Sequence, residues 1–117
     1  MTIQSALTPL SYEILVAVAD EARHGYGIIK EIEARAGEGA APSTGALYLA
    51  LQRLEAEGLI EESQKRRRAG EDARRRYYRL TAAGRRAAVA ETRRLEALVQ
   101  VAREKRLVPA PSSGRTR

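Results

Sequence analysis

The chain has 117 residues, contains no cysteine, tryptophan or phenylalanine, and carries a formal net charge of +6. The absence of cysteine excludes disulfides, thiolate zinc sites and cysteine nucleophiles, and the longest apolar stretch is far shorter than a membrane span. A basic balance is typical of proteins with polyanionic partners, nucleic acid first, although it can also serve solubility alone. No basic segment followed by an apolar run opens the chain, so we expect no signal peptide, no membrane partner and a cytoplasmic location.

The first part of the chain predicts two helices after a short leader. Thr8 followed by Pro9 is typical of a helix start, with a hydroxyl N-cap and proline in the first helical position. Apolar residues at helical spacing extend this helix to about Asp20. Residues 23–25 are predicted as a turn, and a second helix follows that ends near Gly37, a C-cap glycine.

A third helix follows a small-residue loop over residues 38–42. Ser43 or Thr44 is its predicted N-cap, and Gly58 stops it. Its apolar stripe has i, i+4, i+7 spacing and consists of Leu47, Leu51 and Leu54. Three helices with short turns indicate a helix-turn-helix unit.

The pattern then changes to two short strands and one long helix. Residues 59–63 and 75–80 are predicted as the strands of a β-hairpin whose tip lies near residues 69–70. A hairpin after three helices is the winged-helix arrangement. The predicted fold is therefore mainly α with a small β-hairpin: a winged helix-turn-helix domain over residues 1–80, joined to a long C-terminal helix over residues 81–107.

The C-terminal helix predicts a dimer. A helix of about 25 residues is on the order of 37 Å long, more than a domain of this size covers. Its seam is heptad-like and rich in small residues; the predicted interface consists of Ala88, Thr92, Leu95, Leu98, Val99 and Ala102. The alternative is a helix that folds back on its own domain. Residues 108–117 are rich in proline, serine and glycine and are predicted as a disordered basic tail.

The positive charge is concentrated in one window. Residues 65–79 hold eight basic residues and two acids, a net +6 that equals the total for the chain. Arginine is well suited to phosphate because its planar fork can bond two oxygens. The arginines predicted to contact DNA are Arg66, Arg67, Arg68, Arg74 and Arg76. The alternatives are a solvated charge run, or pairing of Arg75 and Arg79 with Glu61 and Glu62 across the hairpin.

The third helix is the predicted recognition helix, the element that contacts the bases of the DNA. Small hydroxyl residues and backbone N–H groups at a helix start suit a phosphate contact, and a glutamine can read an adenine edge. The candidate DNA-binding residues are Ser43, Thr44, Gly45, Tyr48, Gln52 and Arg53. The alternatives are that Ser43 and Thr44 only cap, that Tyr48 packs against the wing, and that Gln52 is solvated.

Neither a catalytic nor a metal site is predicted, and no cofactor is expected. His24 is the only histidine, so we expect its ring to hydrogen-bond locally at the start of the second helix. No nucleophile is placed with a base, and no carboxylate pair suggests a cleft, so the chain is not predicted to be an enzyme.

Three stretches together resemble the PadR-like transcriptional regulators, over about residues 7–106. They are Leu7-Thr8-Pro9-Leu10 with His24-Gly25-Tyr26-Gly27; Leu47-Tyr48 through Leu51, Arg53-Leu54-Glu55 and Gly58-Leu59-Ile60; and Arg75-Arg76-Tyr77-Tyr78-Arg79-Leu80-Thr81 with Gly84. The resemblance implies a homodimer formed through the C-terminal helix and repression of nearby genes. It also implies that the helix beginning at Ser43 sits in the major groove, with Tyr48 near the backbone. Similar regulators often respond to phenolic or multidrug-like ligands, but this chain has the short, single-helix C-terminal form and lacks the tryptophan and phenylalanine on which flat ligands stack, so an effector is left open.

The sequence therefore predicts a DNA-binding transcriptional regulator, a repressor that binds double-stranded DNA at a palindromic operator as a homodimer. Two other classes stay open. One is a winged helix that docks an acidic protein partner or RNA through its basic wing, and the other is a ligand-sensing dimer in which DNA binding is vestigial.

Overall fold

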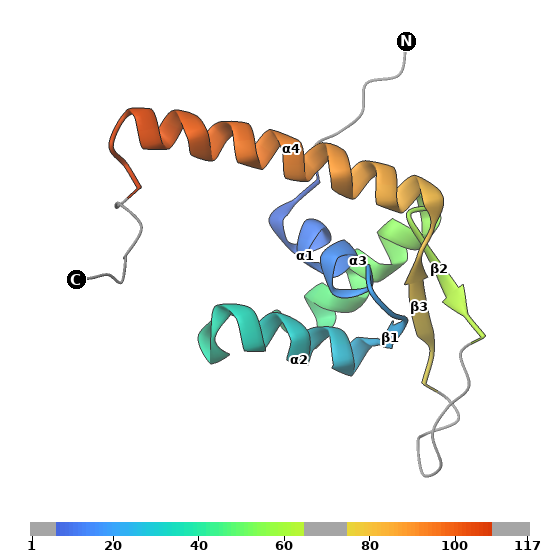
Figure 1. The fold of residues 1–117 in the computed structure, drawn as a ribbon. Coiled ribbons are helices and arrows are strands. Elements are labelled where there is room, and N and C mark those ends of the chain that lie inside the picture. The colour runs from blue at the N-terminus through green and yellow to red at the C-terminus, as the bar shows by residue number, and fades with distance from the viewer. Residues whose placement is uncertain (1–6, 65–74, 109–117) are drawn as a thin grey trace.

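The chain folds into helices and short strands (Figure 1), which a computed structural model describes over residues 7–64 and 75–108. In chain order the elements are α1 (Pro9–Ala17), β1 (Arg23–His24), α2 (Gly25–Ala36), the 3-10 turn η1 (Glu38–Ala40), α3 (Thr44–Ala56), β2 (Ile60–Ser63), β3 (Tyr77–Leu80) and α4 (Ala82–Glu104). The predicted fold class is confirmed: four helices and a small antiparallel sheet make a winged helix within the described residues. Residues 1–6 of the expected leader, the hairpin tip and residues 109–117 of the expected tail lie outside those residues.

Each helix begins at a side chain that accepts a hydrogen bond from its first turn. Thr8 Oγ1 accepts from the Ser11 N–H at 3.1 Å, and Thr81 Oγ1 accepts from the Gly84 N–H at 2.9 Å. Ser43, and not Thr44, caps α3, because its Oγ accepts from the Ala46 N–H at 3.1 Å. These bonds satisfy backbone donors that have no partner inside the helix, and they confirm the helix starts predicted from the sequence.

The predicted turn over residues 23–25 is wrong. Arg23 and His24 form β1, which pairs antiparallel with β3. The expected hairpin of β2 and β3 is therefore part of a three-stranded sheet of order β1-β3-β2. A two-residue strand is too short to show alternation in the sequence. It forms because β3 offers a second edge of hydrogen-bonding groups, and pairing with residues 23–24 makes β3 the central strand.

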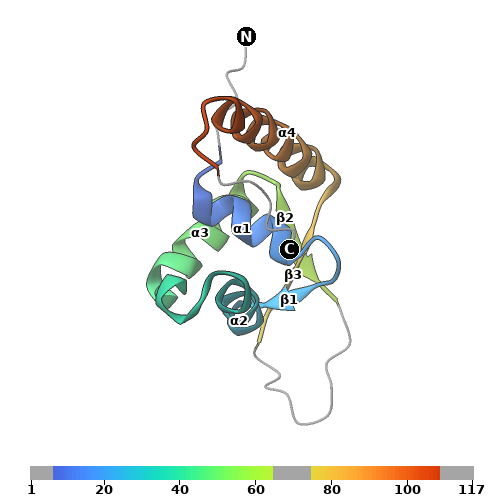
Figure 2. The ribbon, with the colours of Figure 1, turned by 60° about the vertical axis from the view of Figure 1, so that its left-hand side comes forward.

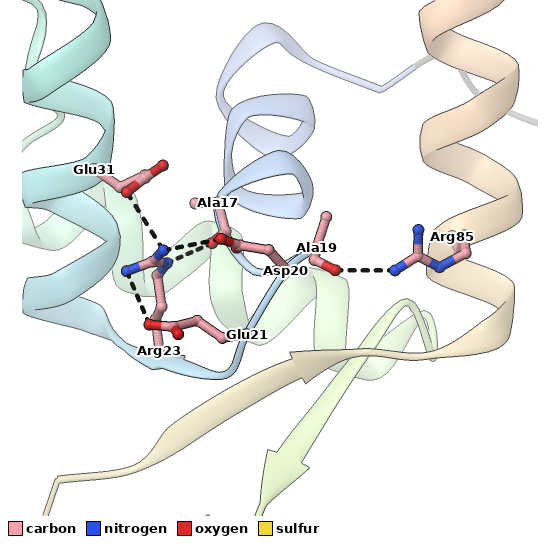
Figure 3. A network of polar contacts seen from close by, with 7 residues as sticks. All are labelled: Ala17, Ala19, Asp20, Glu21, Arg23, Glu31 and Arg85. Carbon is pink, nitrogen blue, oxygen red and sulfur yellow. Dashed lines mark hydrogen bonds and ion pairs between the residues drawn. The ribbon is translucent and has the colours of Figure 1, made fainter.

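Arg23 also explains why α1 ends at Ala17 and not near Asp20 as predicted. Its Nε donates to the Ala17 carbonyl at 2.7 Å, which satisfies an acceptor at the end of the helix. Figure 3 shows the guanidinium enclosed by three carboxylates, each at 3.5 Å: Asp20, Glu21 and Glu31. One arginine thus holds the end of α1, the start of the sheet and α2 together.

The core lies among the first three helices and the sheet. The predicted stripe of α3 is buried as expected and meets buried residues of the other elements: Ile14 and Leu15 of α1 with its C-cap Val18, Ile28 and Ile32 of α2, and Ile60 and Tyr78 of the sheet. α4 crosses over α1 on the opposite side from α2 and α3, and its C-terminal part extends past them (Figures 1 and 2).

The start of α4 is held against the turn that follows α3. Thr81 Oγ1 donates to the Gly58 carbonyl at 2.6 Å, and the Thr81 N–H donates to the Leu59 carbonyl at 3.1 Å. Gly84 is buried there, and a β-carbon at this position would overlap the Leu59 carbonyl oxygen. Glycine is therefore required for this close approach. The predicted end of the helix near Leu107 is three residues too late, since α4 ends at Glu104.

Candidate nucleic-acid interface

One face of α3 is exposed to solvent, and the predicted reading residues lie on it. Leu47, Leu51 and Leu54 are buried, whereas the six candidates are exposed: Ser43, Thr44, Gly45, Tyr48, Gln52 and Arg53. Positions 44, 48 and 52 form one row along the helix, and positions 45, 49 and 53 form the row beside it. α3 thus presents a polar face with small residues at its N-terminal end.

Leu49 is the residue of this face that the sequence reasoning missed. It is 68% exposed, and it lies one turn from both Gly45 and Arg53. A large apolar side chain in the middle of a polar helix face can contact a thymine methyl in the major groove. The signal was in the sequence, because Leu49 falls outside the stripe that fills the core.

Tyr48 lies beside residues at the base of the wing, and its role toward DNA stays a prediction. Its ring is 45% exposed, and its hydroxyl lies against Gly25 in the first turn of α2, where any β-carbon would overlap it. The hydroxyl therefore lies at the junction of α2, α3 and the base of the wing.

Of the five predicted wing arginines, only Arg76 lies within the described residues; Arg66, Arg67, Arg68 and Arg74 lie outside them. Its guanidinium lies 3.0 Å from the Glu62 carboxylate and 3.6 Å from that of Glu55, and the hydrogen bond to Glu62 raises the pKa of Arg76. It also lies 5.7 Å from the ring centre of Tyr78, whose pKa is raised by burial. The guanidinium of Arg76 thus already forms ion pairs with two carboxylates.

The expected pairing across the hairpin is confirmed for one pair. Arg79 Nε donates to Glu61 at 2.7 Å, from the position directly opposite on β2. Glu62 accepts from Arg76, and not from Arg75 as the sequence reasoning suggested. The reason is the register: Glu62 lies opposite Tyr78, and Arg76, two residues before Tyr78, projects to the same face and reaches Glu62.

Arg75 instead turns toward the start of α2. Its Nη1 lies 3.0 Å from His24 Nε2, and its guanidinium carbon lies 5.8 Å from the ring centre of Tyr26. The surrounding hollow has a volume of about 230 Å³ and is lined by His24, Gly25, Tyr26, Tyr48, Arg75, Arg76 and Tyr78. The sequence reasoning did not bring these residues together, because they come from three separate segments. The one signal was the His24-Gly25-Tyr26-Gly27 stretch at a helix start.

The predicted dimer residues divide into two groups along α4. Ala88 packs against the core, Thr92 is hydrogen-bonded to Tyr12 of α1 at 2.7 Å, and Leu95 is half-buried beside α1. Further along, Leu98 is 56% exposed and Val99 is 41% exposed, while Ala102 is half-buried. The seam is therefore partly an intrachain contact, and its role between chains stays a prediction.

No group of three or more histidine, aspartate or glutamate side chains that could hold a metal ion occurs in residues 7–64 and 75–108. In the same part of the chain, no helix is long and apolar enough to cross a membrane.

Solved structures share this architecture. A PadR family transcription regulator from Clostridium difficile is 24% identical, with a TM-score of 0.71 over 83% of this chain and 97% of the other. A transcriptional regulator from Clostridium thermocellum is 28% identical, with a TM-score of 0.68 over 81% and 87%. Bacillus subtilis PadR, solved in complex with operator DNA, is 23% identical, with a TM-score of 0.60 over 71% of this chain and 46% of the longer PadR chain.

No curated protein sequence matches the chain. Its sequence does match the family described as "Transcriptional regulator PadR-like family" over residues 14–90, from the middle of α1 into α4. This match spans the winged helix and most of the motifs that suggested the resemblance. The chain belongs to the PadR-like family of transcriptional regulators.

Proposed function

We propose that the chain is a sequence-specific DNA-binding repressor that acts in the cytoplasm as a homodimer on a palindromic operator. The observation that carries the proposal is the exposed polar face of α3 beside a basic hairpin. The N-terminal part of α3 enters the major groove, and the wing follows the phosphate backbone. The solved complex of Bacillus subtilis PadR with operator DNA supports this use of the fold.

Sequence choice comes from the face of α3. Gln52 and Arg53 offer side-chain hydrogen bonds to base edges, Leu49 offers an apolar contact to thymine methyls, and Thr44 and Tyr48 contact the backbone. The wing residues Arg66, Arg67, Arg68 and Arg74 add affinity that is independent of sequence. Two copies of α3 then read half-sites about one helical turn apart.

The homodimer forms through α4. The exposed apolar side chains Leu98 and Val99 support this proposal, and so does the hollow of about 450 Å³ between α1 and α4, whose lining includes Leu7, Tyr12, Val16 and Leu95. A partner helix along this side would cover both.

The first experiment measures DNA retardation with the promoter region upstream of the chain's own gene. Specific retardation that resists competitor DNA is expected. If any competitor DNA abolishes the retardation equally, the chain binds polyanions without sequence specificity. The absence of DNA binding would contradict the proposal in favour of an acidic protein partner.

The second experiment tests the wing through the salt dependence of binding. Three arginines are changed to glutamine: Arg67, Arg68 and Arg74. The slope of log K against log salt should flatten by about one for each lost phosphate contact. The control removes the same charge from exposed arginines of α4, namely Arg86, Arg93 and Arg103. Equal slopes for both triple variants would show that the effect is one of net charge and not of the wing.

A third experiment tests Leu49 once the operator is known. Replacing each thymine by uracil removes only the 5-methyl group. Where Leu49 contacts such a methyl, the substitution should weaken binding by the native chain by several-fold and leave the Leu49→Ala variant unaffected. Independent, additive effects at every thymine would contradict the contact.

A further inference from the structure

Arg76 contacts both sides of the turn that joins α3 to the wing, the hairpin of β2 and β3. Residues 57–59 form this turn, and Gly58 adopts a left-handed φ of 77° in it. The Arg76 guanidinium lies 3.6 Å from the carboxylate of Glu55, before the turn, and 3.0 Å from that of Glu62, after it. One side chain at the start of β3 therefore spans the connection between α3 and β2.

The geometry around Arg76 involves more than one contact. Its Nε and Nη2 both donate to Glu62 Oε1, at 3.3 and 3.0 Å. Its guanidinium carbon lies 5.7 Å from the ring centre of Tyr78, which is buried in the core. Because Glu62 lies opposite Tyr78 in the sheet, the acid and the ring are on the same face as Arg76. The guanidinium is thus held between α3, β2 and β3.

These contacts contribute more to geometry than to stability. The Glu55, Glu62 and Arg76 side chains are 35%, 42% and 54% exposed, and exposed ion pairs stabilise a fold only slightly. Glu55 also lies in the last turn of α3, where the negative end of the helix dipole disfavours a carboxylate. A cation beside Glu55 offsets this repulsion. The three charges therefore favour one arrangement of α3 relative to β2.

DNA binding depends on that arrangement. In the proposed function α3 enters the major groove while the wing follows the phosphate backbone of the same duplex, so both must fit the DNA at once. A helix and a hairpin that move relative to each other lose this freedom on binding, and the loss lowers the affinity. A contact that fixes their angle in the free protein avoids this cost.

We propose that Arg76 is a positioning residue, which fixes the angle between α3 and the wing through Glu55 and Glu62 and does not itself bind a phosphate. This role rests on the proposed DNA binding and differs from the sequence-based prediction that Arg76 contacts DNA. The two roles have opposite consequences for the acids. A phosphate contact would gain from the removal of carboxylates that compete for Arg76, whereas a positioning role would be lost with them.

The first test removes the arginine and uses the upstream fragment that the chain retards. Arg76→Gln should weaken binding to this fragment roughly fivefold, with a nearly unchanged slope of log K against log salt. A phosphate contact would instead flatten the slope by about one. Binding to a duplex of unrelated sequence should change less, so the ratio of specific to unspecific affinity should fall.

The control for this test is Arg79→Gln. It removes the same charge from the opposite face of β3, where Glu61 accepts a hydrogen bond from the guanidinium. Because this pair does not touch α3, the ratio of specific to unspecific affinity should stay unchanged. An equal fall of the ratio in Arg76→Gln and Arg79→Gln would show an effect of net charge and would overturn the inference.

The second test removes the acids. Glu55→Ala and Glu62→Ala, singly and together, should weaken specific binding, although the loss of an acid strengthens the attraction to phosphate. Glu61→Ala is the matched control and should bind at least as tightly as the native chain. Tighter specific binding by the double variant, or a slope for Arg76→Gln that is flatter by about one, would overturn the inference while the proposed function stands. If no duplex binds the native chain, both fail.

A distance measurement tests the angle without DNA. The chain has no cysteine, so spin labels can be attached at two exposed positions, through Thr44→Cys on α3 and Glu61→Cys on β2. Pulsed electron paramagnetic resonance of labelled chains, diluted in excess unlabelled chain, gives the distribution of distances within one chain. We expect a narrow distribution with native Arg76 and a broader one with Arg76→Gln. Equal widths would overturn the inference.

Discussion

The two halves of α4 carry one stripe of residues but have different surroundings. Ala88, Thr92 and Leu95 lie over α1 and take part in the packing of the domain, whereas Val99, on the same side of the helix, is exposed. Figure 1 shows the reason: α4 is longer than the surface beneath it. A heptad-like stripe in the sequence therefore does not show whether its own domain or a partner chain covers it.

The largest effect of a substitution is expected from a charge in the distal half of α4, the part that follows Leu95. Val99→Glu would place a carboxylate in the proposed dimer interface and raise the dimer dissociation constant about a thousandfold, equivalent to about 4 kcal/mol. Sedimentation at several concentrations measures it. Ala97→Glu adds the same charge on the opposite side of the helix and serves as the control. A dimer of native affinity in the Val99→Glu variant would place the interface elsewhere.

Leu95→Glu tests where the intrachain contact of α4 ends and the proposed dimer interface begins, since Leu95 lies where the two halves of α4 meet. It should both dissociate the dimer and lower the stability of the single chain, because its side chain is half-buried beside α1. Loss of the dimer with no loss of stability would show that Leu95 belongs to the distal group.

The next largest effect is expected at the proximal end. Gly84→Ala would push a methyl group into the Leu59 carbonyl and should lower the free energy of unfolding by roughly 2–3 kcal/mol. Urea denaturation at fixed protein concentration measures this change. Gly45→Ala is the control, since nothing lies within 4 Å of its β-carbon, and it should be neutral or stabilising. Similar midpoints for both variants would contradict the close approach.

A smaller effect is expected from the hydrogen bond between α1 and α4. Thr92 donates its hydroxyl hydrogen to the Ala88 carbonyl at 2.8 Å, so Tyr12 is the donor in its 2.7 Å bond with Thr92. Tyr12→Phe should therefore lower stability by about 1 kcal/mol. Tyr26→Phe, at an exposed position, is the control. Equal stability of the native chain and the Tyr12→Phe variant would show that packing alone, and not this hydrogen bond, stabilises the contact between α1 and α4.

The smallest effect is a pH dependence at Glu91. Its carboxylate accepts from Arg94 at 2.6 and 3.0 Å, and this hydrogen bond lowers the pKa of Glu91. A lowered pKa in the folded state adds stability above the unfolded pKa, and this stability is lost as the pH falls through the folded pKa. Glu91→Gln should therefore reduce the melting temperature at neutral pH but not in strong acid. Arg94→Gln should give the same pattern, and a difference independent of pH would contradict the assignment.

Local chemistry explains what could be predicted from the sequence. A cap depends on a few neighbouring residues, so the caps Thr8 and Thr81 were accessible, as was the buried stripe of α3. For α3 the sequence narrowed the cap to Ser43 or Thr44, and the structure assigns Ser43. The hairpin pairing of Arg79 with Glu61 was also within reach, because the two predicted strands follow each other in the chain and consecutive strands of a hairpin pair antiparallel. Leu49 was accessible too, but its position outside the apolar stripe was overlooked.

Contacts between distant segments were decided only by the tertiary structure. β1 exists because β3 has a second edge, and the hollow around His24 exists because that pairing brings residues 23–24 beside Arg75. The covering of Ala88 and Thr92 by α1 likewise depends on where α4 crosses the domain. The order of the helices, most of their starts and the concentration of charge followed from the sequence, since these depend on local periodicity and composition. Which side chains meet depended on packing, where segments far apart in the chain satisfy each other's hydrogen bonds and bury each other's surfaces.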